Sequence, residues 1–123
     1  MKENYIKILK RFEAIYFFTC DPGAFYAAEP IYEDMKAAGK KCIWIFDGWC
    51  ARNKKAIIES ERANDFKRDT LDINIASSCI IIGGQACSRC NFSMIEHCEK
   101  IGLFSIYLFD NWGTYLDNLI DTA

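Results

Sequence analysis

The segment that decides the fold is Ser77-Ser-Cys-Ile-Ile-Ile-Gly-Gly-Gln-Ala-Cys-Ser-Arg-Cys-Asn-Phe-Ser-Met-Ile-Glu-His-Cys-Glu-Lys-Ile-Gly-Leu-Phe-Ser-Ile-Tyr-Leu-Phe-Asp110. Its first apolar run, Cys79–Ile82, is typical of a strand covered on both faces, and Gly83-Gly84 ends that run in a turn. A helical pattern follows up to Gly102, which stands where a C-cap belongs. A second apolar run covers 104–109. The segment therefore predicts a strand–helix–strand unit with parallel strands. The residues that share the buried helical face are Met94, Cys98 and Ile101.

A similar unit lies upstream. The apolar run 14–20 ends in Asp21-Pro-Gly-Ala24, helix-forming sequence continues to Gly39, and a strand is expected over 42–46. Its last part, Ile43-Trp-Ile-Phe-Asp-Gly-Trp-Cys50, matches Ile106-Tyr-Leu-Phe-Asp-Asn-Trp-Gly113. Two such units in one short chain predict an α/β fold: a Rossmann-like three-layer α/β/α sandwich with a mainly parallel sheet of four to five strands. Residues 1–123 form one domain in this interpretation.

The remaining elements are predicted from local patterns. An amphipathic helix over 2–12 should pack on the sheet, and Asp21 should cap the next helix with Pro22 in its first position. Pro30 either starts that helix or kinks it. The apolar face of the first helix would be Tyr5, Ile8, Leu9 and Phe12, and the buried stripe of the second would be Ile31, Met35 and Ala38.

Two stretches are harder to assign. Residues 53–69 are rich in charge and favour a surface helix with Phe66 among its apolar points. Leu71–Ile75 alternates and fits either a short strand at the sheet edge or a helical turn that leads into the next strand. Beyond Asp110, a short closing helix is expected. Its apolar positions would be Tyr115, Leu116, Leu119 and Ile120.

Composition excludes several classes of protein. A formal charge of −2 gives no electrostatic reason to expect nucleic acid or an anionic membrane, and no apolar run reaches the roughly 20 residues of a membrane span. The N-terminus lacks a signal-peptide pattern. Seven cysteines, several of them inside apolar strands (Cys20, Cys42 and Cys79), suit reduced thiols in a cytoplasmic protein. No glycine fingerprint for a nucleotide is present, so no cofactor is expected.

In an open parallel sheet, ligands bind beyond the carboxyl ends of the strands. Four loops with small or acidic residues are expected there, and two of them lead into helices whose N-terminal N–H groups suit phosphate or carboxylate. The same residues also serve as ordinary turns and caps, and the tryptophans there either cover the sheet end or stack on a ring-shaped ligand. The candidate ligand-binding residues are Asp21, Gly23, Asp47, Gly83, Gly84, Gln85, Asp110 and Trp112.

A second candidate is the Cys87-Ser-Arg-Cys90 motif near a helix start. A helix N-terminus and a nearby cation such as Arg89 both lower a thiol pKa, so the pair suits redox chemistry. The surrounding sequence lacks a thioredoxin pattern, and a zinc site would need four ligands, so incidental small residues remain the simplest interpretation. No metal site is predicted, His97 is expected to face solvent, and no catalytic residue can be assigned.

The first strand with Asp21-Pro-Gly-Ala24, the helix with Pro30, the strand that ends in Gly83-Gly84 and the final Leu108-Phe-Asp-Asn-Trp-Gly-Thr-Tyr115 together resemble the N-terminal half of GT-B glycosyltransferases and UDP-N-acetylglucosamine 2-epimerase-like proteins. Gln85-Ala86-Cys87 replaces the Thr-Ser part of the corresponding loop. The resemblance implies an acceptor-side domain, whose nucleotide-sugar donor would bind to a second domain that this chain lacks.

Three functions are therefore open. The first is a module that binds a sugar, sugar phosphate or nucleotide sugar, alone or with a separate donor-binding partner. In that case, we expect Gly84→Val to abolish binding and spare the fold. The second is a thiol redox or metal protein that uses Cys87 and Cys90. The third is a non-catalytic module that forms a homodimer through a sheet edge or the aromatic turns.

Overall fold

A computed structural model describes residues 2–47, 60–68, 72–84 and 89–108 of the chain. Five strands form one sheet in the order β3-β2-β1-β4-β5, and all four pairings are parallel. This architecture confirms the predicted α/β Rossmann-like fold, whose first five strands take this order. The strands are β1 (Ala14–Thr19), β2 (Lys41–Phe46), β3 (Ser60–Arg62), β4 (Ser78–Gly83) and β5 (Phe104–Leu108). The helices are α1 (Lys2–Leu9), α2 (Pro22–Ala37), α4 (Ala63–Arg68) and α5 (Arg89–Ile101), with a 3-10 turn at Ile75–Ser77.

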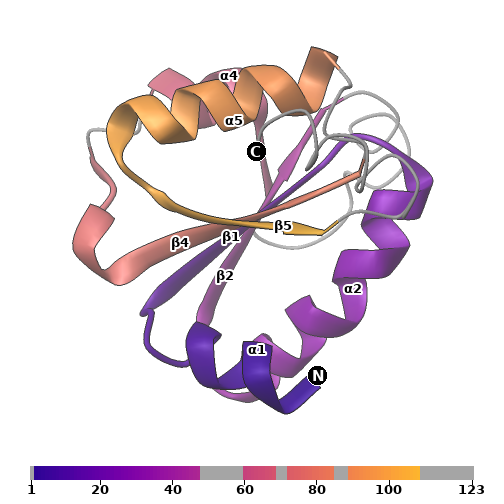
Figure 1. The fold of residues 1–123 in the computed structure, drawn as a ribbon, viewed down its shortest axis with the longest axis vertical. Helices are drawn as coiled ribbons and strands as arrows, with labels where there is room; N and C mark the ends of the chain where they lie inside the picture. The colour runs from indigo at the N-terminus through magenta and orange to yellow at the C-terminus, as the bar shows by residue number, and fades with distance from the viewer. Residues whose placement is uncertain (1, 48–59, 69–71, 85–88, 109–123) are drawn as a thin grey trace, which may run out of the picture.

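Strand β1 lies in the middle of the sheet and is covered on both faces (Figure 1). Ile15 and Phe17 belong to the core under α1 and α2, whereas Tyr16 and Phe18 belong to the core under α4 and α5. The alternation of side chains along a strand explains this division. The largest buried side chain, Trp44, is fully enclosed. The three layers of the predicted sandwich are therefore present in the described residues.

Helix α2 starts where the sequence predicts. Asp21 is its N-cap and Pro22 lies in its first turn. The helix then continues through Pro30, so this proline does not start the helix. Pro30 is exposed, and the carbonyl four residues earlier belongs to exposed Tyr26, so water can replace the missing hydrogen bond.

Two predicted apolar faces need correction. Ile31 and Met35 are buried in α2, but Ala38 is exposed because it is the C-cap, beyond the last buried turn. In α1, Leu9 is buried, whereas Ile8 is 38% exposed. Ile6 packs on the core in place of Ile8, so the helix is rotated relative to the prediction.

The predicted helix over 53–69 is also partly wrong. Residues 53–59 lie outside the described part, and Ser60–Arg62 is a strand that pairs with β2. A short edge strand needs few apolar residues, so it leaves little periodicity in the sequence. Helix α4 follows, and its Phe66 is buried as expected. Within Leu71–Ile75, the described residues form no strand, and the 3-10 turn that begins at Ile75 favours the helical alternative.

Helix α5 confirms its predicted face. Met94 and Cys98 are fully buried, and Ile101 packs against the same core. Gly102 has φ +76°, which suits the C-cap. His97 corrects the sequence interpretation, because it is only half exposed and its Nε2 atom is buried, with no hydrogen-bond partner among the described residues. Its ring packs edge-on against Phe66, with 6.0 Å between the ring centroids.

The cysteines divide into two groups. Cys42, Cys79 and Cys98 are free and buried, as expected for thiols in apolar strands and helices. Cys20 is buried too, but it is disulfide-bonded, so the prediction of a reduced thiol is wrong at this position. No described helix combines the length and the apolar character that a membrane crossing requires.

The environment of His97 predicts a pH-dependent stability. Burial lowers the pKa of His97 below its ordinary value of 6.5, and the charges of Lys67 and Lys100 lower it further. The unfolded chain therefore takes up a proton at His97 before the folded chain does, and stability falls as the pH drops through about 6.5. We expect the urea midpoint to fall more between pH 7.5 and 5.5 in the wild type than in His97→Gln. Parallel pH profiles for the two proteins would contradict this account.

Candidate functional site

The candidate site lies at the carboxyl ends of β1 and β4, where one connection leads to α2 on one face of the sheet and the next leads to α5 on the other. Strands β1 and β4 are neighbours, and their carboxyl ends continue into α2 and towards α5, respectively. Figure 1 shows α2 and α5 on opposite sides of the sheet. From β1 the chain proceeds to β2 on one side, and from β4 to β5 on the other, so this pair of strand ends is the topological switch point of the sheet. Ligands of open α/β sheets bind at such a point.

Asp21 is the acidic group on the β1 side of this point. Its Oδ1 atom accepts a hydrogen bond from the Ala24 N–H at 2.8 Å, and its backbone carbonyl accepts from Phe25 N–H at 3.1 Å. The carboxylate therefore neutralises the positive end of the α2 dipole. The side chain is half-buried, with its second oxygen directed towards the turn after β4. Asp21 thus links the cap of α2 to the glycine turn.

The glycine turn is tightly enclosed. A Cβ atom at Gly83 would lie 3.3 Å from Ala24 Cβ, and one at Gly84 would lie 2.8 Å from both Asn91 Nδ2 and Asp21 Oδ2. Gly84 also has φ +113°, where side chains are strained, and its N–H donates to Leu108 O at 2.9 Å. The structure argues against the expectation that Gly84→Val spares the fold, because a valine is strained at this φ and its Cβ would displace the ends of two polar side chains.

Asn91 completes the described part of the site, and the sequence analysis missed it. It lies in the first turn of α5 and is 1% exposed, and its Oδ1 atom is 3.6 Å from Cys20 Sγ. Asp21, Gly84 and Asn91 thus meet at one point, although they come from three different segments. The only local signal was a polar residue near a helix start, which is also the ordinary position of a cap.

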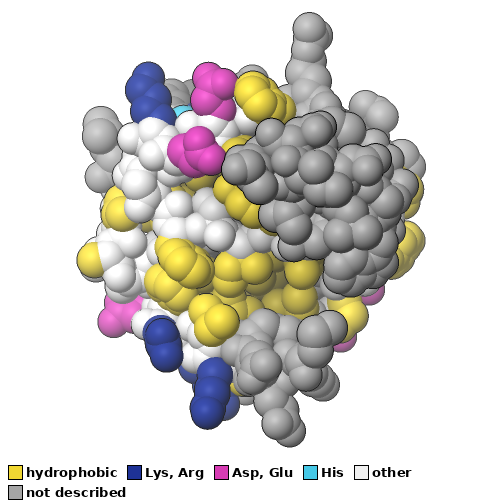
Figure 2. Space-filling view, viewed as in Figure 1, with side chains coloured by type: hydrophobic (Ala, Val, Ile, Leu, Met, Phe, Trp, Pro, Cys, Tyr) yellow, Lys and Arg dark blue, Asp and Glu magenta, His cyan; other side chains and the backbone are white. Residues whose placement is uncertain are grey.

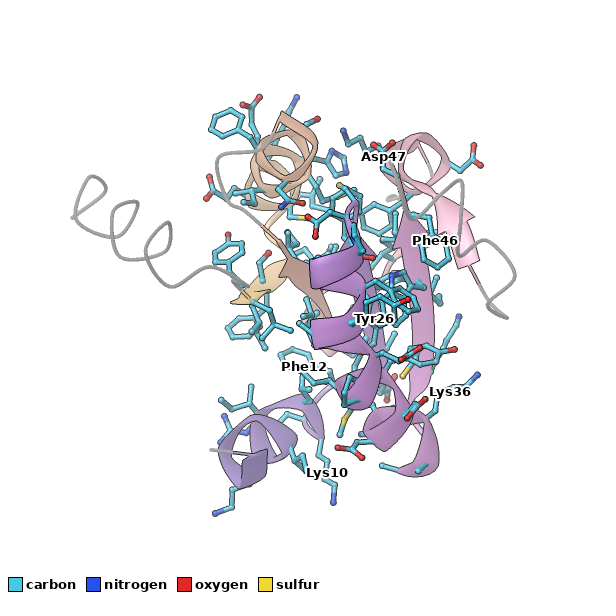
Figure 3. The ribbon with its side chains drawn as sticks, turned by 90° about the vertical axis from the view of Figure 1, so that its right-hand side faces the viewer. Lys10, Phe12, Tyr26, Lys36, Phe46 and Asp47 are labelled. Atoms are coloured by element: carbon cyan, nitrogen blue, oxygen red, sulfur yellow. The ribbon has the colours of Figure 1, made fainter. Side chains whose placement is uncertain are left out.

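The other predicted residues divide as follows. Gly23 is exposed in the first turn of α2. Asp47 is exposed just after β2, on the side of β1 away from β4, and Figure 3 shows it at the opposite end of the sheet from Lys36. Asp47 therefore shares the rim of the sheet with Asp21, but no described contact joins them. Gln85, Cys87, Asp110 and Trp112 lie outside the described residues, and of Cys90 only the backbone is described, inside α5.

The described thiols away from the rim are poor candidates for chemistry. Burial raises the pKa of Cys79 to about 12 and that of Cys98 to about 12. Such thiols stay protonated near neutral pH and are inert as nucleophiles. Within the described ranges, no group of three histidine, cysteine or acidic side chains is placed to hold a metal ion.

The comparisons with known proteins leave the family open. No protein-family model matches the chain, and it has no significant match among curated proteins or solved structures. The function must therefore be argued from the geometry of the switch point itself.

The glycine turn predicts a graded effect of substitution. Gly39 also has positive φ (+82°), but an added Cβ there meets nothing within 4 Å. We expect Gly39→Ala to cost about 1–2 kcal/mol from backbone strain alone. Gly84→Ala should cost about 1–3 kcal/mol more, because its Cβ also displaces Asp21 and Asn91. Urea unfolding of the two variants measures the difference, and equal losses would show that the turn is not tightly packed.

Proposed function

We propose that this chain is a Rossmann-like binding module that holds a small sugar- or phosphate-containing ligand at the carboxyl ends of β1 and β4. The observation that carries the proposal is the meeting of Asp21, Gly84 and Asn91 at the topological switch point. The glycine lets Asp21 and Asn91 approach the turn closely, and these two polar side chains offer hydrogen-bonding groups of different character.

The charges at the two helix starts suggest how such a ligand would be oriented. The Asp21 carboxylate already occupies the α2 start and would repel an anion there. Helix α5 starts with Arg89 and has no acidic residue in its first turn, so its N–H groups and dipole favour a phosphate. A carboxylate accepts hydrogen bonds from hydroxyl groups. The matching ligand class therefore carries hydroxyls at one end and phosphate at the other, as sugar phosphates and nucleotide sugars do.

The resemblance to the acceptor-side half of GT-B glycosyltransferases supports the same class of ligand. In this proposal, the module supplies one wall of a site, and a separately encoded donor-binding partner or a second copy supplies the other. Group transfer would require that second wall, because reaction in a GT-B enzyme occurs between two domains. We propose a cytoplasmic location: the free thiols Cys42, Cys79 and Cys98 agree with it, whereas the disulfide at Cys20 is unusual for that compartment.

Binding is tested with one charge removed and the helix cap kept. Asn caps helices about as well as Asp, so Asp21→Asn should preserve stability while it removes the charged acceptor. In a thermal-shift screen of sugar phosphates and nucleotide sugars, we expect at least one compound to raise the melting temperature of the wild type. Its affinity should fall roughly ten- to hundredfold in Asp21→Asn, as expected for a hydrogen bond to a charged group.

The matched control is Glu33→Gln, which removes one exposed negative charge elsewhere on α2. This variant should bind as the wild type does. A screen without any stabilising compound, or equal losses in both variants, would contradict the proposed site.

A second candidate function is thiol–disulfide exchange, because Cys20 forms a disulfide at the same end of the sheet. Its position just after β1 and its contact with Asn91 place one sulfur at the switch point. Reaction with a dithiol reductant would transfer two electrons and two protons, so that the disulfide becomes two thiols and the reductant becomes a disulfide. Of the thiol candidates predicted from sequence, Cys90 lies in the first turn of α5, and Cys87 lies outside the described residues.

The exchange function is tested by equilibration in glutathione buffers of stepped potential, followed by alkylation and mass spectrometry. We expect a regulatory or catalytic disulfide to have a midpoint above about −300 mV, and a purely structural one to lie below it. Cys20→Ser should remove the transition, whereas Cys98→Ser, at a free thiol in the core, should leave it unchanged. A midpoint below that value would remove this candidate.

A further inference from the structure

The surface around α1 and the start of β5 exposes large apolar side chains. Phe104, the first residue of β5, is 50% exposed, and Ile8, in the last turn of α1, is 38% exposed. The Phe104 ring stacks on Phe12, four residues after Ile8, with 5.4 Å between the ring centroids. This contact joins α1 to β5, so the two exposed apolar side chains belong to one surface.

Basic side chains from two segments gather at the same surface. Lys7, Lys10 and Arg11 are exposed in α1 and just after it, and Lys41 is exposed at the start of β2. The Lys40 Nζ atom donates a hydrogen bond to Lys10 O at 2.7 Å, which holds the two segments side by side. Figure 2 shows apolar side chains on this face of the molecule and basic side chains below them. We use the term basic-apolar surface for Lys7, Ile8, Lys10, Arg11, Lys40, Lys41 and Phe104.

The local charge of this surface is opposite in sign to the net charge of the chain. Within segments 6–13 and 38–41, five residues are basic, and Glu13 is the acidic one. The formal charge of the whole chain is −2. Attraction to a charged membrane falls off within a Debye length of roughly 8–10 Å, so it depends on the charges that face the membrane and not on the total.

We propose that the basic-apolar surface docks on an anionic lipid bilayer. Phe104 and Ile8 would enter the boundary between headgroups and acyl chains, which removes exposed apolar area from water. The long lysine and arginine side chains would reach the lipid phosphates around them. A cluster of roughly four to eight such residues on an amphipathic helix is typical of binding to anionic lipids. Nucleic acid would also attract the basic residues, but its phosphate backbone offers no apolar phase for Ile8 and Phe104.

The strand directions determine which way a docked molecule would face. Lys41 begins β2 and Phe104 begins β5, and the strands from β2 to β5 pair in parallel through β1 and β4. The basic-apolar surface therefore lies at the amino ends of the strands, and Figure 3 shows Lys10 at the opposite end of the molecule from Asp47. The switch point, at the carboxyl ends of β1 and β4, would face away from the bilayer. This consequence for a ligand rests on the proposed function, whereas the docking itself does not.

The docking is tested by co-sedimentation of the full chain with lipid vesicles. We expect binding to mixed vesicles of phosphatidylcholine and phosphatidylglycerol, and none to phosphatidylcholine alone. Each basic residue near such a surface changes the affinity about fivefold, so Lys10→Gln should weaken binding about fivefold. The triple variant Lys7→Gln, Lys10→Gln, Arg11→Gln should weaken it about a hundredfold. The matched control is Lys100→Gln, an exposed position on α5 on the other face of the sheet, which should bind as the wild type does.

A second pair of variants tests the apolar part of the surface. Phe104→Ser should lower the affinity for the mixed vesicles roughly three- to tenfold, because about half of a phenylalanine side chain no longer leaves water on docking. Phe92→Ser is the matched control, since Phe92 is 60% exposed on α5. It should leave the affinity unchanged. Circular dichroism at the assay temperature checks that both variants are folded, and the charge variants alter exposed side chains only, so they decide the question independently.

Three results would overturn the proposal. The first is the absence of binding to the mixed vesicles, or equal losses of binding in Lys10→Gln and Lys100→Gln. The second is tighter binding to duplex DNA than to the vesicles, which would assign the basic residues to nucleic acid. The third is a dimer in light scattering that Phe104→Ser dissociates, without vesicle binding, which would assign the surface to a second copy of the chain. None of these measurements involves a soluble ligand, so a failure here is distinct from a failure of the thermal-shift screen.

Discussion

The structure depends on the burial of β1 between β2 and β4. Each face of this strand carries two large apolar side chains, so both faces must be covered by helices. At its carboxyl end, Thr19 is fully buried, and its Oγ1 atom accepts a hydrogen bond from Trp44 Nε1 at 2.8 Å. That bond satisfies the only polar atom of the largest core side chain and ties β1 to β2 just before the chain turns into α2. Because one connection leaves on each side of the β1–β4 pair, the switch point between α2 and α5 is a consequence of how the core is covered.

The polar groups at the switch point follow from packing. Ala24, in the first turn of α2, lies so close to Gly83 that a Cβ at Gly83 would be in tight contact with it. A Cβ at Gly84 would collide with Asp21 and Asn91. Because Gly84 has no side chain, the Asp21 and Asn91 side chains can both lie beside it, one from the start of α2 and the other from the first turn of α5. Burying a carboxylate and an amide side by side costs folding free energy unless both groups are hydrogen-bonded. Asp21 serves the fold by capping α2, where its carboxylate offsets the positive end of the helix dipole.

The sequence predicted the parts of the fold that rest on long apolar runs and strong punctuation. The β1, β2, β4 and β5 runs are long enough to be unambiguous, and Asp21-Pro22 and Gly102 mark helix ends by known backbone chemistry. It failed where tertiary contacts override local pattern. Strand β3 consists of Ser60, Glu61 and Arg62 and is defined by its pairing with β2, and the His97 ring packs against Phe66 from another helix. Within the site, Asp21, Gly83 and Gly84 were predictable as turn residues, but Asn91 was not, because nothing near it in the chain reveals a partner 70 positions away.

The two edges of the sheet differ in a way that constrains every partner. Strand β3 is three residues long and carries Glu61 and Arg62, which is the usual protection of an edge against further pairing. Strand β5 has no charged residue, and it exposes Phe104 and Tyr107 on opposite faces. Among the described strands, β5 pairs with β4 on one side only, so the backbone groups of its other side point out in the plane of the sheet, whereas its apolar residues Phe104, Ile106 and Leu108 lie on one face. A helix packed on that face and a strand paired along that edge would therefore contact different groups of the same strand.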